Sequence, residues 1–196
     1  MPGAFRERDV KIGRHVPISA GAIPLFMESF QVQYSNLGRV DQIIGSACAH
    51  HRLLWIHPFL DGNGRVARLM SYAMLQQGLQ TKGLWSVARG LARNEADYKS
   101  HLNNCDLPRR NDLDGRSQLS EEALAEFTRF FLKTCIDQVE FIEGLMQPQA
   151  LRNRVMIWAE EEIRNGTLPK SADVALRALL QEGELHHARI PELHRH

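Results

Sequence analysis

Cysteine is scarce in this 196-residue sequence, and long apolar runs are missing from it. The three cysteines, Cys48, Cys105 and Cys135, are widely spaced and form no Cys-x-x-Cys pair, so neither a disulfide framework nor a zinc ribbon is indicated. No apolar stretch reaches the roughly 18 residues that a membrane span requires, and the N-terminal residues lack the apolar core of a secretion signal. These absences predict a cytoplasmic protein without a membrane partner.

An excess of charge of either sign is also missing. The chain has 24 Lys and Arg residues against 23 Asp and Glu residues, a formal net charge of +1. This balance argues against a disordered chain, an acidic tail or a surface that coats nucleic acid. With 43% hydrophobic residues, the chain is long enough to bury a proper core as one domain of ordinary size.

A dense group of reactive side chains begins at His57 and ends at Arg68, in the stretch His-Pro-Phe-Leu-Asp-Gly-Asn-Gly-Arg-Val-Ala-Arg. Apolar residues at helical spacing follow over 69–75, which predicts a loop that leads into a helix. The first N–H groups of a helix have no partner inside it, and the helix dipole places partial positive charge there. A helix start at Gly-Asn-Gly can therefore bind an anion, with Asn63 either left-handed or acting as the helix cap.

The charged side chains of this stretch suit nucleotide chemistry. Arg65 and Arg68 are three residues apart on one side of the first helical turn, and guanidinium groups bind phosphate oxygens well. Asp61 could hold Mg²⁺ between phosphates, and His57 could take a proton from a hydroxyl group. Each feature alone is commoner as a turn, a packed histidine or a solvated helix face. Their joint spacing favours transfer of part of a nucleotide onto a hydroxyl.

The stretch resembles the signature of Fic domains, His-x-Phe-x-(Asp/Glu)-Gly-Asn-Gly-Arg-x-x-Arg, at every fixed position. The resemblance implies that His57 is the base that activates a Ser, Thr or Tyr hydroxyl of a target protein. That hydroxyl would attack the α-phosphate of ATP, giving an AMP-modified protein and pyrophosphate. By the same resemblance Phe59 is a buried anchor, Asp61 holds Mg²⁺, Arg65 meets the β-phosphate and Arg68 the γ-phosphate. The resemblance also implies that Gly62, Asn63 and Gly64 form the anion hole.

Near the N-terminus, residues 10–18 alternate apolar and polar side chains around a glycine, which predicts a short hairpin closed by a proline. Fic domains carry a similar segment as a flap, here about residues 8–18, that pairs with the target's backbone and lines the nucleotide pocket. The target protein would dock there by strand addition. The matching positions are Ile12, Gly13, Arg14 and His15.

Apolar stripes predict helices over most of the remaining chain, at about 24–30, 40–56, 65–78, 84–91, 94–102, 120–142, 148–164 and 172–182. We therefore expect an all-α fold, a Fic-type helical bundle with a small N-terminal β-hairpin flap. By resemblance the Fic domain covers 1–185, and the tail 186–196 is the truncated lead into a winged-helix domain. His50 and His51 are not at i, i+4 from each other or from His57, so we predict packing roles for both.

Tyr98 has two interpretations. It can pack against Leu102, four residues further along the same helix. By the Fic resemblance it lines the adenosine pocket, and Lys99 stands where many Fic domains have a second tyrosine. Further along, the polar residues 112–115 lack the acidic spacing of a calcium loop and are predicted to form a connection.

Many Fic proteins carry an inhibitory helix with the pattern (Ser/Thr)-x-x-x-Glu-(Gly/Asn), whose glutamate pairs with the second arginine of the motif. Here Val139 precedes Glu143 and Ala178 precedes Glu182, where the pattern needs a hydroxyl. An inhibitory helix would then lie upstream, come from another polypeptide, or not exist. We predict that this chain alone keeps Arg68 free and is active.

Three alternatives to AMP transfer follow from the same motif. Doc-type phosphotransferases bind the nucleotide reversed and move the γ-phosphate, and they usually carry lysine where this chain has Gly64. Transfer of another nucleotide or of phosphocholine uses the same signature. The non-enzymatic alternative is a nucleotide-binding regulator, which a damaged motif would favour, and this motif is intact.

Overall fold

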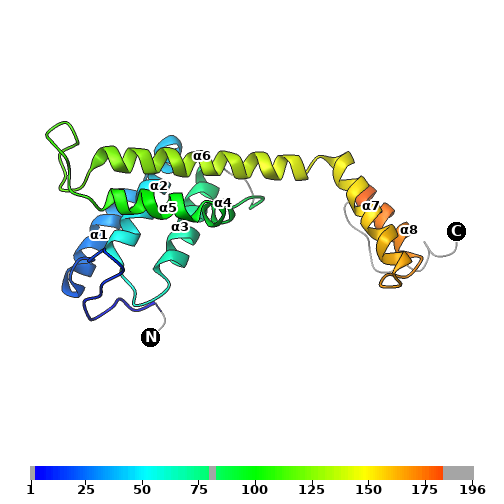
Figure 1. The fold of residues 1–196 in the computed structure, drawn as a ribbon, viewed down its shortest axis with the longest axis horizontal. Helices are drawn as coiled ribbons and strands as arrows, with labels where there is room; N and C mark the ends of the chain where they lie inside the picture. The colour runs from blue at the N-terminus through cyan, green and yellow to red at the C-terminus, as the bar shows by residue number, and fades with distance from the viewer. Residues whose placement is uncertain (1–2, 80–82, 183–196) are drawn as a thin grey trace. The chain divides into compact units, whose positions relative to one another are not determined.

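The computed structural model describes residues 3–79 and 83–182, and the regular secondary structure in these ranges is helical (Figure 1). The predicted all-α class is confirmed, since the described ranges contain no β-strand. None of their helices is long and apolar enough to cross a lipid bilayer. In chain order the elements are the 3-10 turn η1 (Ala20–Ala22), α1 (Ile23–Tyr34), α2 (Arg39–Ile56), α3 (Asn63–Leu79), α4 (Val87–Arg93), α5 (Glu95–Cys105), α6 (Glu121–Leu145), α7 (Pro148–Arg164) and α8 (Ala172–Glu182).

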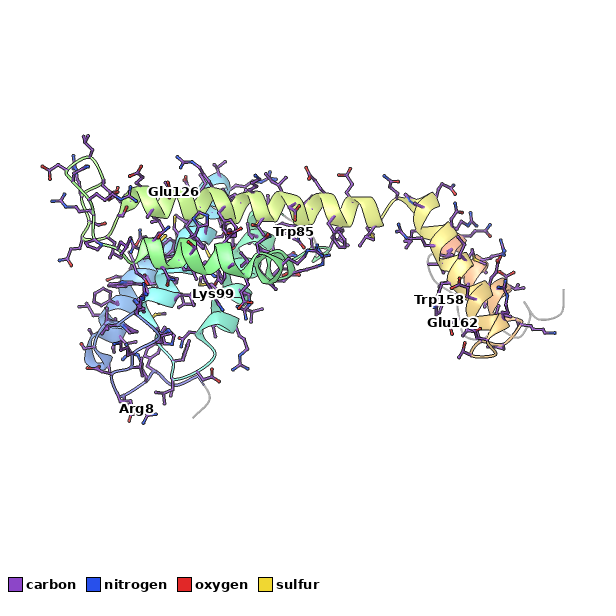
Figure 2. The ribbon with its side chains drawn as sticks, in the orientation of Figure 1. Arg8, Trp85, Lys99, Glu126, Trp158 and Glu162 are labelled. Carbon is purple, nitrogen blue, oxygen red and sulfur yellow. The ribbon has the colours of Figure 1, made fainter. Side chains whose placement is uncertain are left out.

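The chain divides into two compact units, Met1–Glu140 and Phe141–His196, with the boundary inside α6. The first unit holds every residue of the 57–68 motif. In the second, α7 and α8 pack against each other, and α7, which carries the labelled Trp158 and Glu162, buries Ala159 (Figure 2). The Fic-type domain boundary at 185 stays a prediction, and the tail 186–196 lies outside the described residues.

The core of the first unit forms where α2 and α3 pack side by side (Figure 1). Gly78 lets these helices approach, because a Cβ there would lie 3.3 Å from the Ile43 side chain. From α6, Phe127 and Phe131 are fully buried and contact the ring of His50 on α2. Both ends of the motif are thus attached to buried helices, which fixes the position of the loop between them.

The predicted N-terminal β-hairpin is wrong, because residues 10–18 do not form two strands. Only Ile12 and His15 pair, through two backbone hydrogen bonds of 3.0 Å, around Gly13 at φ 59°. The next hydrogen-bonded pair of an antiparallel ladder would join residues 10 and 17, and Pro17 has no N–H to donate. The segment is therefore a tight turn with a single β-bridge. The described residues of the N-terminal region contain no strand.

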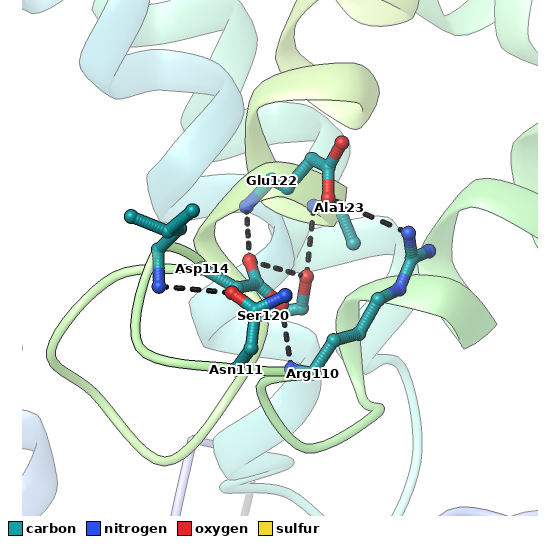
Figure 3. Close-up of polar contacts among 7 residues, drawn as sticks. Arg110, Asn111, Asp114, Ser120, Glu122 and Ala123 are labelled. Atoms are coloured by element: carbon teal, nitrogen blue, oxygen red, sulfur yellow. Dashed lines mark hydrogen bonds and ion pairs between the residues drawn. The ribbon is translucent and has the colours of Figure 1, made fainter.

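The loop before α6 is held by a buried carboxylate (Figure 3). Asp114 accepts from the Glu122 N–H at 2.9 Å, the Arg110 N–H at 2.9 Å and the Ser120 hydroxyl at 2.9 Å. The backbone donors lower the pKa of Asp114, because they stabilise the ionised form. Ser120 in turn accepts from the Ala123 N–H at 3.1 Å, the N-cap contact expected at a helix start. The predicted connection at 112–115 is therefore an ordered cap for α6.

Candidate functional site

His57 occupies the sharp corner where α2 ends. It has a left-handed backbone, with φ 51° and ψ 60°, and it is the only described residue other than glycine with a positive φ. Such a conformation costs a non-glycine residue about 1–3 kcal/mol and persists only where surrounding contacts enforce it. Its N–H donates to the Leu53 carbonyl at 3.0 Å, which closes the last turn of α2.

Burial lowers the pKa of His57, and the nearby charges of His15 and Arg6 lower it further. An imidazole with a lowered pKa is neutral at pH 7, which is the protonation state that can accept a proton. The side chain is only half-buried, so a substrate hydroxyl can reach it. The ionisation and exposure of His57 therefore suit a general base.

Asn63 clamps the motif loop. Its amide accepts from the Phe59 N–H at 3.0 Å and donates to the Phe59 carbonyl at 2.7 Å, and the residue is 3% exposed. Of the two roles predicted for Asn63, left-handed residue or helix cap, the left-handed one belongs to Gly62, at φ 85°. Phe59, expected as a buried anchor, is only partly buried and contacts the ring of Phe5 at 6.0 Å. The loop is thus rigid because of side-chain to backbone bonds across its base.

Beyond this clamp, the start of α3 offers free N–H groups. The helix begins at Asn63, and its first i to i−4 bond runs from the Val66 N–H to the Gly62 carbonyl at 2.9 Å. The N–H groups before Val66 have no acceptor within the helix, so they are available to an anion.

Both arginines fold back over this helix start. A Cβ on Gly62 would lie 3.3 Å from Nη2 of Arg65, and a Cβ on Gly64 would lie 3.4 Å from Nη1 of Arg68. The guanidinium groups therefore lie against the two glycines at the start of α3. We call the free N–H groups of 63–65 with the two guanidinium groups the phosphate cradle.

One cradle arginine is paired with the predicted metal ligand. Arg65 Nη2 lies 3.0 Å from Asp61 Oδ2, and both side chains are mostly exposed. An exposed pair of this kind contributes little stability. Asp61 also accepts from the Gly62 N–H at 2.6 Å, which turns the carboxylate towards the cradle. Both charged groups can exchange partners readily when a phosphate or a cation arrives.

A buried hydrogen-bond relay supports the other arginine. Ser71 donates to the Ala67 carbonyl at 2.8 Å, so its oxygen accepts from Nδ1–H of His50 at 2.9 Å. Nε2 of His50 then has no proton and accepts from the Tyr98 hydroxyl at 2.8 Å. The Tyr98 oxygen keeps its lone pairs for the guanidinium of Arg68 beside it. Arg68 is thus oriented by a chain of neutral side chains that runs from buried Ser71 through His50 to Tyr98.

A pocket of about 410 Å³ opens next to Arg68 and Tyr98. Lys99, labelled in Figure 2, pairs with Glu95 at 2.5 Å at its edge. No carboxylate of the described residues lies within ion-pair distance of Arg68. The remaining lining consists of Ala88, Leu91 and Ala92.

The residues of the N-terminal turn divide into two groups. Ile12, Gly13 and Arg14 are exposed at its tip. His15 points inward, where Nδ1 lies 3.1 Å from Asp106 and Nε2 lies 2.9 Å from the Trp55 carbonyl. The hydrogen bond with Asp106 raises the pKa of His15, because both ring nitrogens can donate only in the charged form.

Replacing Asp106 by asparagine should loosen this turn. Burial alone would raise the pKa of Asp106, but the bonds with His15 and His51 lower it to about 2. The pair is therefore complete at pH 5 to 6, below the unfolded pKa of His15 and above that of Asp106. There we expect Asp106→Asn to lower the free energy of unfolding by about 1–3 kcal/mol, measured by urea titration.

The variant should also lower the pKa of His15, and the pair's contribution in the wild type should fade as pH rises through that raised value. Asp112→Asn, at an exposed loop aspartate, is the control. Equal stability of both variants would show that Asp106 does not anchor the turn.

His50, the histidine of the relay, should give the free energy of unfolding a second dependence on pH. Burial lowers the pKa of His50 to about 3. In the folded protein His50 therefore stays neutral, whereas in the unfolded chain it binds a proton when the pH falls below about 6.5. Between pH 6.5 and 5 the wild type should lose about 2 kcal/mol more stability than His50→Gln. Parallel stability curves for the two proteins, measured by urea unfolding at each pH, would contradict the buried neutral imidazole.

Sequence reasoning missed three groups of this site. The packing role predicted for His50 is confirmed by its burial against Phe127 and Phe131, but its hydrogen-bond relay to Arg68 depends on the approach of α5 and was missed. Asp106 follows α5 in sequence and gives no local sign of a histidine partner. Arg6 lies in a polar N-terminal segment, and nothing in its neighbourhood predicts that its side chain is buried.

Comparison with known proteins identifies one family for the N-terminal part of the chain. Residues 1–75 match the model of the Fic/DOC family. The "Protein adenylyltransferase Fic" of Drosophila erecta is 35% identical over 77 residues, covering 38% of this chain and 16% of that protein. The corresponding Drosophila yakuba protein is 36% identical over the same length, with the same coverage. These alignments thus span only about a sixth of the relatives' length.

The fold has a counterpart among solved structures. The crystal structure of a Fic family protein from Desulfovibrio desulfuricans G20 matches 97% of this chain and 53% of its own, with a TM-score of 0.56 and 19% sequence identity. At this identity the match concerns the fold.

Proposed function

This chain is a Fic domain protein, and from that premise we propose that it transfers AMP from ATP to a Ser, Thr or Tyr hydroxyl of a target protein. One observation supports the proposal above the others. The guanidinium groups of Arg65 and Arg68 lie against the Gly-Asn-Gly start of α3, and His57 stands at the other end of the same clamped loop. A base and a polyphosphate site are thereby held by one short rigid segment.

The chemical step needs one proton acceptor. Neutral His57 takes the proton of the target hydroxyl while its oxygen forms a bond to the α-phosphorus of ATP. The bond from that phosphorus to the bridging oxygen breaks, and pyrophosphate leaves with the electron pair. The phosphate cradle stabilises the charge that develops on the phosphates, with Arg65 on the β-phosphate and Arg68 on the γ-phosphate. Tyr98 lines the adjoining pocket for the adenosine.

Asp61 suits the magnesium ion expected with ATP. Among the described residues, no group of three or more His, Cys, Asp or Glu side chains gathers into a metal site. Mg²⁺ bound with nucleotides commonly uses one or two carboxylates and takes its other ligands from phosphates and water. The exposed carboxylate of Asp61 beside the cradle fits that requirement, and the ion when bound would neutralise charge on the phosphates.

The target protein would dock at the N-terminal turn. Its tip, Ile12 to Arg14, is exposed, and the single bridge leaves backbone groups on either side of it for an added strand. A hollow of about 910 Å³ beside Asp61, bordered by Phe5 and Phe59, offers room for target side chains. An inhibitory helix, if one acts on this domain, would come from outside the described residues, and this chain by itself would be active.

Doc-type phosphotransfer is the nearest alternative. Where Doc-type sequences have lysine, this chain has Gly64, and a Cβ there would already lie 3.4 Å from Arg68. That distance is ordinary van der Waals contact, but the rest of a lysine side chain would fill space that the cradle leaves for a phosphate. The glycine therefore favours AMP transfer over γ-phosphate transfer, while another nucleotide or phosphocholine remains an alternative donor group for the same site, and a regulator without turnover is less favoured.

Labelled ATP tests the proposal directly. The purified chain is incubated with cell extract, Mg²⁺ and ATP labelled at either the α- or the γ-phosphate. AMP transfer puts the α label, and no γ label, onto protein. Incorporation of the γ label would support phosphotransfer instead, and incorporation of neither would exclude ATP as the donor.

A further inference from the structure

Arg6 is a fully buried arginine that lies next to the base. Its side chain has no exposed surface. Nε donates to the His57 carbonyl at 2.8 Å, and Nη1 donates to the Arg8 carbonyl at 3.0 Å. Nη2 donates to the carbonyls of Ile18 and, at 3.5 Å, Ile56. One side chain therefore joins the end of α2 to both sides of the N-terminal turn.

The contacts fall on three successive carbonyls. Besides the guanidinium bonds to the carbonyls of Ile56 and His57, the backbone N–H of Arg6 donates to the Pro58 carbonyl at 2.8 Å. These carbonyls follow the last turn of α2, where the helix dipole is negative and a cation is favourable. Arg6 therefore holds the backbone before, at and after His57, the residue with the left-handed conformation.

The Arg6 charge is balanced mainly by these carbonyls. Its carboxylate neighbour, Asp9, lies 3.7 Å away with its own side chain 76% exposed. Burying a charge without a close ion pair is unfavourable unless hydrogen bonds satisfy every donor. The fork of a guanidinium can reach several carbonyls at once, whereas the single ammonium group of lysine cannot.

We infer that Arg6 is a positioning residue for His57, which holds the carbonyls of residues 56–58 and so fixes the position of the imidazole relative to the phosphate cradle. This inference rests on the proposed AMP transfer for its kinetic consequence. Its structural part, the left-handed backbone at His57, does not depend on that function.

The charge of Arg6 also bears on the base. Burial is the largest cause of the lowered pKa of His57, and the charges of His15 and Arg6 add to it. Other charged groups of the motif, Asp61 and Arg65, are paired with each other at the surface. Removing the Arg6 charge should therefore raise the pKa of His57 and move the acid limb of the pH–rate profile to higher pH.

The test compares Arg6→Met and Arg6→Lys with Arg39→Met in the full chain. Arg39 is a matched control, because its Nε donates at 2.9 Å to the carbonyl of Gly78 near the end of α3, away from the motif. Arg6→Met should lower kcat for AMP transfer about 100-fold, as expected for a small misplacement of a catalytic group. KM for ATP should stay unchanged because the phosphate cradle is on α3, and Arg6→Lys should recover part of kcat.

A second readout does not need activity. With histidine labelled by ¹³C and ¹⁵N, the His57 signals are identified from their loss in His57→Asn. In Arg6→Met these signals should lose the backbone shifts typical of a positive φ and titrate at higher pH, whereas Arg39→Met should leave them unchanged.

Unaltered His57 signals and unaltered kcat in Arg6→Met would overturn the inference, as would an equal loss of kcat in Arg39→Met. If Arg6→Met does not fold, the same comparison is made with Arg6→Lys. If the wild type transfers no AMP, the proposed function fails, and the His57 signals still decide the role of Arg6.

Discussion

Replacing His57 by alanine should lower the rate of AMP transfer about 100- to 10,000-fold, the range that a general base contributes. The imidazole is the group of the clamped loop that is neutral at pH 7 and able to accept a proton. ATP binding should be retained, because the cradle is built from the backbone and side chains of α3. The measurements are the transfer rate with α-labelled ATP and the affinity for ATP by calorimetry.

The pH dependence of the wild-type transfer rate tests the same role of His57 as general base. Because burial lowers the pKa of His57, the transfer rate should fall to half its maximum at a pH below the ordinary histidine value of about 6.5. His101→Ala, at a histidine stacked on Phe130 at 4.8 Å, is the control and should transfer normally. Unchanged transfer by His57→Ala would remove this histidine from the mechanism.

Replacing Arg68 by glutamine should produce the second large effect, on nucleotide binding. A charge-assisted bond between a guanidinium and a phosphate contributes about 1.5–3 kcal/mol, so we expect Kd for ATP to rise roughly 10- to 150-fold. The loss should be larger for ATP than for AMP, because the contact is made with the γ-phosphate. Calorimetric titration with each nucleotide measures the difference.

Arg129→Gln, at an exposed arginine of α6, is the matched control and should bind both nucleotides like the wild type. Tyr98→Phe should weaken ATP binding less than Arg68→Gln, since it removes only the support of the arginine by the relay. Equal losses for ATP and AMP in Arg68→Gln would show that this arginine does not contact the γ-phosphate.

The helices could be predicted from the sequence because their apolar residues recur at helical spacing. The stripe of α2 ends at Ile56, immediately before the motif, and α3 continues to Leu79, one residue beyond the predicted stop at Gly78. The motif itself was recognisable because its residues are neighbours in the chain.

The N-terminal turn shows what local pattern does not determine. Alternation around Gly13 predicted two strands, but Pro17 removes the N–H that the second pair of the ladder needs. The partners of His15 in this turn come from far away in sequence, as when Asp106 binds its ring. A pattern-based prediction cannot include such partners.

The loop of the motif was also predicted only in part. Its glycines and asparagine indicated a tight turn, but which residue would be left-handed depended on the Asn63 amide finding the backbone of Phe59. His57 adopts a positive φ that its residue type disfavours, because Arg6 and Leu53 hold its backbone. Both features result from tertiary contacts that overrule local preference.

Mass spectrometry of the modified protein tests the central claim most directly. The wild-type chain and His57→Ala are incubated with ATP, Mg²⁺ and cell extract, and modified peptides are fragmented to locate the added group. We predict an added AMP on a Ser, Thr or Tyr side chain with the wild type and none with His57→Ala. An added phosphate, or AMP added equally by both proteins, would contradict the account.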